Sequence, residues 1–270
     1  MSAAKGTGSD APVLLTVRDG VARIVLNRPE SSNGMNIELL RALNDAIMAC
    51  HADAGVRCVL LSGNGPNFCA GGDVRVFASM GENLPTYIRE ATAYLQMAIA
   101  GLMRLAPPVV AAVHGFAAGG GGFGLVCAVD FVVAAESAKF LAGATRVGMA
   151  PDAGVSVTLP RLVGMRKAMD ILLTNPTLTA AEAKQLGIIN TVVPDDQLAD
   201  SAQKLARSLA DGAPKALAAT KRLLWNGVGS SVEACLPEEA RTVAELSGTA
   251  DSREGLAAVI ERRQPVFRGQ

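Results

Sequence analysis

Apolar and polar positions alternate along the first half of the chain in a way that predicts strands and helices in turn. Two runs rich in β-branched residues, Val13–Val17 and Val21–Leu26, are separated by Arg18-Asp19-Gly20. Asp-Gly between two such runs is a strong hairpin signal. A helix is expected next, because apolar residues three to four positions apart would share one face of it: Ile37, Leu40, Leu43 and Ile47.

Three further apolar runs are predicted strands: Val56–Ser62, Val109–Val113 and Phe131–Ala135. The first of them is continuous enough to be buried on both faces. Apolar positions at helical spacing from Ile88 to Leu105 predict a long helix between the first two runs, which Pro107-Pro108 ends. A second helix is expected within the glycine-rich stretch before the third run. Strands that alternate with helices in this order indicate an α/β fold with parallel strands.

From Pro160 onward the pattern is helical alone. Four segments are helical candidates: Asp196–Leu209, Pro214–Trp225, Val232–Leu246 and Leu256–Arg263. The stretches Thr179-Ala-Ala-Glu182 and Asp251-Ser-Arg-Glu254 resemble capping boxes. We therefore divide the chain into a flexible N-terminal tail (residues 1–12), an α/β core (13–195) and a helical C-terminal region (196–270).

Composition excludes several classes of protein. Half of the 270 residues are hydrophobic and 19% are charged, as in a globular domain and unlike a disordered chain. Lys+Arg and Asp+Glu are equal at 25 each, so there is no electrostatic case for a nucleic acid or an anionic membrane as partner. The first twelve residues lack the apolar region of a signal peptide, and glycines interrupt the apolar run Pro107–Val129, which is therefore not expected to span a membrane.

The chain has five cysteines and two histidines, and their spacing matches no metal site. An odd, scattered set of cysteines is typical of buried free thiols in a reducing compartment, so we expect a cytoplasmic protein. The cysteines are Cys50, Cys58, Cys69, Cys127 and Cys235.

Candidate chemistry is concentrated in three loops, each of which follows a predicted strand. They are Asn64–Val74, His114–Gly124 and Val147–Pro160. Ligands of parallel α/β sheets bind beyond the carboxyl ends of the strands, where such loops can converge. The third loop holds one charged residue, Asp152, among small and apolar neighbours, where a bare carboxylate is costly.

The glycines of the second loop allow three interpretations. Gly119-x-Gly121-x-x-Gly124 formally matches a dinucleotide-binding fingerprint, but the acidic residue expected about 20 positions later is missing. The glycines could instead serve a tight turn with close helix packing. They could also expose backbone N–H groups at a helix N-terminus, where these donors would stabilise a developing oxyanion.

Three side chains in these loops have functional and structural interpretations. Cys69 could be a nucleophile, although no base motif accompanies it and a packed thiol is favoured. His114 could be a base, although its place at a strand end favours a structural role. Asp73 could bind a metal, but capping a helix is the favoured role. Two backbone donors and one buried carboxylate suit proton transfer beside a thioester carbonyl.

Five stretches of the chain carry a resemblance to a known family: "LNRPESSNGMN", "NFCAGGDV", "PPVVAAVHGFAAGGGGFGLVCAVDFVVAAESAKF", "LTAAEAKQLGIINTVVP" and "SREGLAAVIERRQPVF". Together they resemble the crotonase superfamily, also called the enoyl-CoA hydratase/isomerase family. The first three are similar to its first loop, its first oxyanion loop and its central signature, and the last two to its C-terminal part. The resemblance implies a crotonase-like spiral of ββα units closed by a helical C-terminal region. It also implies an acyl-CoA thioester substrate and a homotrimer or a dimer of trimers.

By position in the family pattern, Ala70 and Gly121 would supply the two oxyanion N–H groups. The four-glycine run is one residue longer than usual and leaves Gly120 as an alternative to Gly121. The resemblance also implies substrate contacts with the CoA moiety from Arg28, Ala70, Gly71, Gly72 and Asp73.

The sequence departs from the family's hydratases at both water-activating glutamates. Alignment puts Gly124 and Ala144 at those positions, which makes ordinary hydration doubtful and would leave room for a bulky acyl group. Asp152 lies where some isomerases of the family carry their single acid/base. Its apolar setting should raise its pKa toward neutrality. The alternative is that Asp152 only caps the helix that follows Pro151.

The sequence thus favours a Δ3,Δ2-enoyl-CoA isomerase in which Asp152 moves a proton from C2 to C4 of a dienolate. No metal or redox cofactor is expected, because CoA is part of the substrate. The alternatives are hydration or thioester hydrolysis run from Asp152, and a non-catalytic binding protein of the same fold. Some members of the family bind RNA, but the zero net charge and the absence of a basic run argue against that role here.

Overall fold

The computed structural model describes residues 10–270, and the predicted tail lies outside the described residues up to residue 9. The chain begins with an antiparallel hairpin of β1 (Val13–Arg18) and β2 (Val21–Leu26). Its turn residues Asp19 and Gly20 have φ values of 51° and 76°. A two-residue hairpin turn of this kind needs positive φ at both positions, which Asp-Gly supplies. The predicted hairpin is confirmed.

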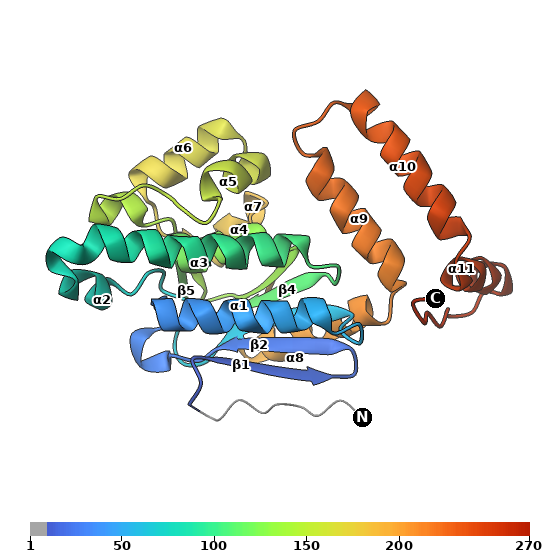
Figure 1. The fold of residues 1–270 in the computed structure, drawn as a ribbon, viewed down its shortest axis with the longest axis horizontal. Coiled ribbons are helices and arrows are strands. Elements are labelled where there is room, and N and C mark those ends of the chain that lie inside the picture. The colour runs from blue at the N-terminus through green and yellow to red at the C-terminus, as the bar shows by residue number, and fades with distance from the viewer. Residues whose placement is uncertain (1–9) are drawn as a thin grey trace.

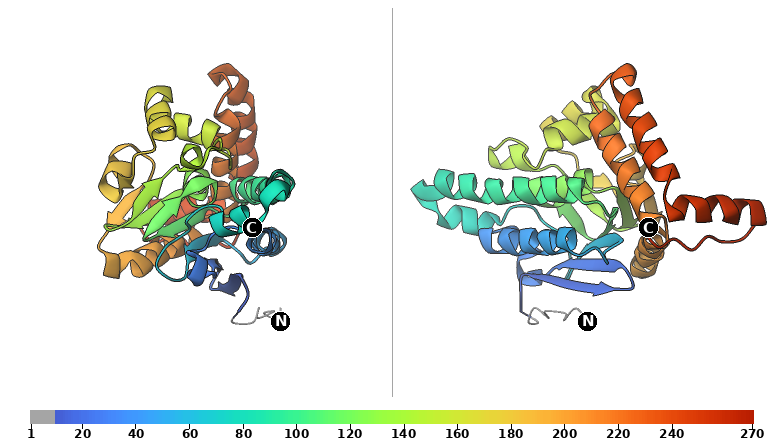
Figure 2. Two further views of the ribbon diagram at one scale, coloured as in Figure 1. Left: turned by 90° about the vertical axis from the view of Figure 1, so that its left-hand side faces the viewer. Right: turned by 45° about the vertical axis from the view of Figure 1, so that its right-hand side comes forward.

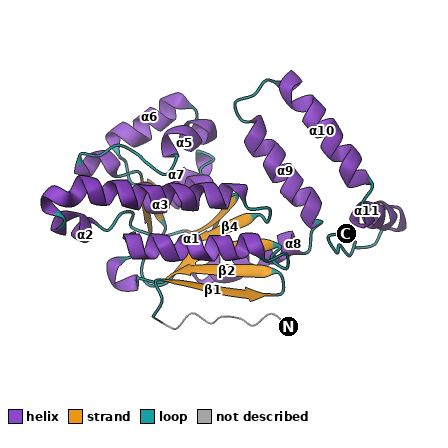
Figure 3. Cartoon of the chain, in the orientation of Figure 1, coloured by secondary structure: helices purple, strands orange, loops and turns teal. Residues whose placement is uncertain are grey.

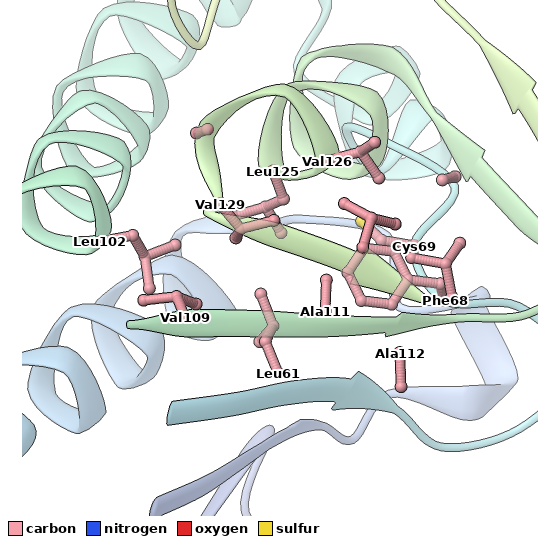
Figure 4. Close-up of a cluster of buried hydrophobic side chains, with 14 of the residues drawn as sticks. Leu61, Phe68, Cys69, Leu102, Val109, Ala111, Ala112, Leu125, Val126 and Val129 are labelled. Carbon is pink, nitrogen blue, oxygen red and sulfur yellow. The ribbon is translucent and has the colours of Figure 1, made fainter. Parts of the chain in front are cut away.

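A six-stranded sheet forms the centre of the molecule, with the strand order β1-β2-β3-β4-β6-β9. The pairs from β2 to β9 are all parallel. Its remaining strands are β3 (Cys58–Gly63), β4 (Val109–Val113), β6 (Phe131–Ala135) and β9 (Thr191–Val193). All five residues of β4 are buried, which fits its continuous apolar run. Figure 4 shows part of this core, where Leu61 and Ala111 of the sheet lie beneath Leu125 of α4 (Gly119–Ala128).

A second, three-stranded sheet was not predicted. It consists of β5 (Phe116–Ala118), β7 (Lys139–Leu141) and β8 (Leu178–Thr179). Strands of two or three residues are too short to show a periodicity in sequence. Successive units place one strand in each sheet: β4 is followed by β5, and β6 by β7. This repeated ββ arrangement is the spiral that the resemblance implied.

Helices cover both faces of the large sheet. On one side, α1 (Ile37–Ala52) and α3 (Leu84–Arg104) lie next to each other, and α8 (Leu198–Ala210) lies on the other side (Figures 1 and 2). Because α8 packs on β3, β4 and β6, it belongs to the core although it falls in the predicted C-terminal region. The shorter helices are α2 (Val74–Ser79), α5 (Val155–Val163), α6 (Met165–Thr174) and α7 (Ala180–Gln185).

The last three helices project from one end of the α/β core, as Figures 1 and 3 show. They are α9 (Pro214–Gly227), α10 (Val232–Ser247) and α11 (Ala250–Glu261). The capping box of Thr179 and Glu182 is confirmed at the start of α7. The one expected at Asp251 is wrong, because Thr249 caps α11. The buried Asp251 carboxylate accepts the backbone N–H groups of Arg268 and Gly269 instead.

Within residues 10–270, no helix is both long enough and apolar enough to cross a membrane.

Candidate active site

The three loops singled out from the sequence converge on one cavity of about 510 Å³. The first loop contributes Ala70 and Gly72, the second Gly119–Gly121 and the third Asp152. The rest of the wall is largely apolar and comes from the segment before α1, from α1, α2 and α3, and from β7 and the segment after it. It includes Met35, Leu40, Phe77, Ile88, Leu95, Leu141, Val147 and Met149. A cavity with apolar walls and a few polar groups is the usual form of a small-molecule site.

Three of the four glycines, Gly119, Gly121 and Gly122, pack the start of α4 against the first loop. A Cβ added to Gly121 would lie 3.1 Å from Gly71 Cα, and one added to Gly122 would lie 2.1 Å from the Cys69 carbonyl oxygen. Gly119 has a φ of 61°. The interpretation of the glycines as a tight turn with close packing is therefore confirmed, and the run also opens a helix at Gly119.

The start of α4 also presents backbone donors to the cavity. The first N–H groups of an α-helix have no partner within the helix. Ala118, the N-cap residue, donates its N–H to the Cys69 carbonyl, and the N–H groups of Gly119, Gly120 and Gly121 come next in the first turn. Both Gly120 and Gly121 line the cavity, so both candidate oxyanion donors belong to the site.

The other predicted donor, the Ala70 amide, already has a partner. It donates to the Ser32 carbonyl oxygen at 3.0 Å, although Ala70 itself lines the cavity. An oxyanion at this position would therefore compete with a backbone carbonyl for the Ala70 N–H, or share it.

Asn33 organises the first loop, and the sequence analysis missed it. Its buried side-chain Nδ2 donates to the carbonyl oxygens of Asn64, Asn67 and Phe68 at 2.9–3.1 Å. Its Oδ1 accepts the N–H of Arg28. One side chain thus ties the segment after β2 to the loop that carries Ala70. The Asn33-Gly34 dipeptide is a turn signal that could have drawn attention to this residue.

The Asp152 carboxyl lies in the cavity wall and caps no helix. The following helix, α5, begins at Val155, and its N-cap residue is Gly154. Burial raises the pKa of Asp152 above its usual value, which agrees with the expected direction. Asp152 is also the only acidic residue among those that line the cavity in the described part of the chain. A half-buried carboxyl of this kind suits a group that takes and returns a proton.

The two positions aligned with the family's glutamates differ in their surroundings. Ala144 lines the cavity, as expected for a position that leaves room for the acyl group. The same expectation for Gly124 is wrong, because Gly124 is buried away from the cavity. A Cβ added to it would lie 2.5 Å from Ala153 Cβ, so Ala153 already fills this space.

Arg28 and Asp73, the predicted contacts to the CoA moiety, form an ion pair with 3.1 Å between Nη1 and Oδ2. The Asp73 side chain is only 8% exposed and caps α2 by accepting the N–H of Val76. Neither side chain lines the cavity. The pair thus joins the segment after β2 to the start of α2, and contact of these two residues with CoA stays a prediction.

The structural interpretations of Cys69 and His114 fit their surroundings. Cys69 is fully buried, its thiol donates to the Asn33 carbonyl, and burial raises its pKa to about 12, which is unsuitable for a nucleophile. A ring nitrogen of His114 lies 2.9 Å from the Gly65 carbonyl oxygen, away from the cavity-lining residues. All five cysteines are free, and residues 10–270 contain no cluster of side chains able to hold a metal ion.

Comparison with known proteins agrees with the fold and the motifs. A family model described as enoyl-CoA hydratase/isomerase matches residues 16–270. A Rhodobacter capsulatus protein named "Probable enoyl-CoA hydratase" is 39% identical over 254 residues, which cover 94% of this chain and 96% of that protein. The Escherichia coli protein named 1,2-epoxyphenylacetyl-CoA isomerase is 36% identical over 96% of this chain and 98% of its own length.

Solved structures agree as well. The crystal structure of an enoyl-CoA hydratase from Bacillus anthracis has a TM-score of 0.91 and 32% sequence identity, and the match covers 96% of this chain and all of that one. A structure from Pseudomonas aeruginosa has a TM-score of 0.79 and 38% identity over 85% of this chain and 97% of that chain. The chain therefore belongs to the enoyl-CoA hydratase/isomerase family, also called the crotonase superfamily.

Proposed function

We propose that this member of the family is a Δ3,Δ2-enoyl-CoA isomerase. The observation that carries the proposal is that Asp152 is the single acidic side chain that residues 10–270 contribute to the cavity wall. Burial raises the pKa of this carboxyl. One carboxyl that exchanges its proton with the substrate is sufficient for moving a double bond. Hydration by the family's usual route needs two carboxylates to hold and activate water, and Gly124 and Ala144 stand in their places.

In the proposed mechanism the thioester oxygen accepts hydrogen bonds from the start of α4 and from the Ala70 loop. These donors stabilise the negative charge that develops on this oxygen when a proton leaves C2. Ionised Asp152 takes that proton, and the electron pair forms the dienolate. The same carboxyl then delivers its proton to C4, which restores the thioester carbonyl and leaves the double bond between C2 and C3. Mass is conserved throughout.

The reaction needs no metal or redox cofactor, because the thioester itself acidifies C2. The substrate is an acyl-CoA, with an acyl group of apolar character to match the cavity wall. By family resemblance the protein assembles as a homotrimer or a dimer of trimers, and its free thiols suit the reducing cytoplasm.

A second candidate is isomerisation of an epoxide of an acyl-CoA. It is supported by the 36% identity to the protein named 1,2-epoxyphenylacetyl-CoA isomerase, and it too adds no water. Other relatives are named enoyl-CoA hydratases, so hydration is the competing reaction.

The test is incubation of the purified protein with 3-enoyl-CoA, 2-enoyl-CoA and an epoxyacyl-CoA in separate reactions, with products identified by mass and NMR. We expect 3-enoyl-CoA to give a product of unchanged mass with the double bond between C2 and C3. A product of 2-enoyl-CoA heavier by one water, formed faster than any isomerisation, would overturn the proposal. Conversion of the epoxide alone would favour the second candidate.

A further inference from the structure

The third loop rests on a particular face of α4. Gly120 and Gly124 are four positions apart in the helix, so they lie on the same face, one turn from each other. The consecutive residues Asp152 and Ala153 pack against these two positions. We infer that Gly120 and Gly124 form a seat for the third loop and that Gly120 is a positioning residue, which admits the Asp152 carboxyl to the start of α4. The inference deepens the proposed function and rests on it for the role of Asp152.

The contact at Gly120 leaves no space for a side chain. A Cβ added there would lie 1.4 Å from Asp152 Oδ1, 2.4 Å from Cγ and 2.8 Å from Oδ2. All three separations are shorter than any normal contact between nonbonded heavy atoms. A methyl group at position 120 therefore cannot coexist with the Asp152 carboxyl in its present position, and the carboxyl would have to turn away from the start of α4.

The contact at Gly124 holds the next residue of the loop. A Cβ added to Gly124 would meet Ala153 Cβ at 2.5 Å and a methyl carbon of Val155 at 3.5 Å. Ala153 is 3% exposed and has a φ of 52°, which is unfavourable for a residue with a side chain. A methyl group buried in this conformation implies that the surrounding packing holds the loop firmly.

The seat explains how a carboxyl and the backbone donors come to share one site. Gly120 belongs to the first turn of α4, and the residues of this turn line the cavity together with Asp152. A larger residue at position 120 would leave the N–H groups of this turn in place and displace only the acid/base. The backbone at Gly120 has no positive φ, so alanine fits its conformation and keeps the N–H. Gly120→Ala is therefore a test of space alone.

The first measurement compares Gly120→Ala, Asp152→Asn and the double variant in isomerisation and in deuterium exchange at C2. We expect each single variant to lose about 10²-fold or more in kcat, with the KM for acyl-CoA little changed. The double variant should be no slower than the slower single variant, because both changes remove the same proton transfer. Gly248→Ala is the matched control and should keep full activity, because Gly248 is exposed at the end of α10 and an added Cβ would make only an ordinary contact, 3.5 Å from the Glu245 carbonyl oxygen.

The second measurement uses the melting temperature to test the contact between position 120 and the Asp152 carboxyl. It gives a result even if Gly120→Ala is too unstable for an activity assay. The melting temperature should fall on Gly120→Ala in the native background and fall much less in an Asp152→Gly background, where the carboxyl is gone. The swap Gly124→Ala with Ala153→Gly should likewise be more stable than Gly124→Ala alone. If Gly120→Ala lowered the melting temperature equally in the native and Asp152→Gly backgrounds, the proposed contact between Gly120 and Asp152 would be wrong.

The two sets of results separate the inference from the proposed function. Full activity in Asp152→Asn would reject the acid/base role, while the melting temperatures would still decide on the seat. Loss of activity in Asp152→Asn with full activity in Gly120→Ala would reject the positioning role of Gly120 and leave the proposed function standing.

Discussion

Asp152 is a charged side chain whose surroundings favour its neutral form. Its pKa is raised by burial, and the loop that carries it is held on α4 by contacts at Gly120 and Gly124. We predict that Asp152→Asn, which keeps the shape and removes the proton carrier, lowers isomerisation by about 10²- to 10⁴-fold. Acyl-CoA binding, measured by calorimetry, should change little. Activity equal to that of the native protein would contradict the acid/base role.

The raised pKa of Asp152 also predicts a pH dependence of stability. The native state holds this proton to a higher pH than the unfolded chain, whose aspartates titrate near about 3.9. The stability that this group contributes is therefore complete below the unfolded pKa and is lost as the pH rises through the raised native value.

Asparagine does not titrate. The stability of Asp152→Asn relative to the native protein should therefore increase as the pH rises from the unfolded pKa of Asp152 through its raised native pKa. Urea denaturation at pH 4 and pH 7 would measure the difference. A gap that is the same at both pH values would contradict the prediction.

The sequence could identify Asp152 but could not identify its partners. A lone carboxylate in an apolar stretch is visible in the chain itself, because its cost does not depend on the fold. Gly120 and Asn33 could not be assigned their roles in this way. Asn33 binds carbonyl groups 31 to 35 positions away, and Gly120 meets a carboxyl in another loop. Such contacts are set by the path of the chain in space.

At the scale of elements, the packing of the third loop on α4 decides whether glutamates introduced at positions 124 and 144 can reach the cavity and catalyse hydration. Ala144 faces the cavity and has room for a longer side chain, whereas the space beside Gly124 is filled by Ala153. We predict that the native protein hydrates crotonyl-CoA at background rates.

The Gly124→Glu, Ala144→Glu double variant should also remain at background. It should lose stability by about 1–3 kcal/mol, as overpacking usually causes. Ala144→Glu alone is the control and should be more stable than the double variant. Rapid hydration by the double variant but not by Ala144→Glu, followed by the absorbance of the conjugated thioester, would contradict the assignment of Gly124 to the buried face of α4.

Elements with a long or continuous pattern were predicted well, and short ones were not. The bounds of β4 and β6 agree with the apolar runs, because strands buried on both faces need uninterrupted apolar residues. The strands of the small sheet escaped prediction because two or three residues carry no period. The start of α11 was misplaced at Asp251, since Thr249 and Asp251 are both good capping residues and only the structure distinguishes them.

At the scale of the whole molecule, a buried ion pair fastens the projecting helices to the core. Lys221 on α9 lies 2.6 Å from Asp130, which ends the segment after α4, and the two side chains are 8% and 13% exposed. The Lys221 ammonium also donates to the Leu102 carbonyl, and Asp130 accepts the N–H of Val109. Burial lowers the pKa of Lys221, so the pair depends on both members being present.

We predict that Lys221→Met lowers the free energy of unfolding by about 3–5 kcal/mol, because it leaves Asp130 buried without its cation. The Lys221→Met, Asp130→Asn double variant should recover much of this loss, since asparagine still accepts the Val109 N–H. Urea denaturation measures both. If the double variant were less stable than Lys221→Met, the loss could not be due to an uncompensated charge.

The projecting helices also expose several large apolar side chains. Val259 and Ile260 on α11 are 78% and 80% exposed, and Val243 on α10 is 66% exposed. Exposed apolar side chains that gather on neighbouring helices mark interaction surfaces. The assembly implied by the family resemblance would cover them.

We predict that the native protein is oligomeric in solution and that Val259→Glu with Ile260→Glu shifts it toward monomers. The reason is that a buried, unpaired carboxylate in an apolar interface costs more than the contact it replaces provides. Light scattering after size exclusion measures the mass of each species. Lys204→Glu, an exposed change on α8, is the control and should keep the native mass. The prediction fails if the native protein elutes as a monomer, or if the control dissociates as readily as the α11 variant.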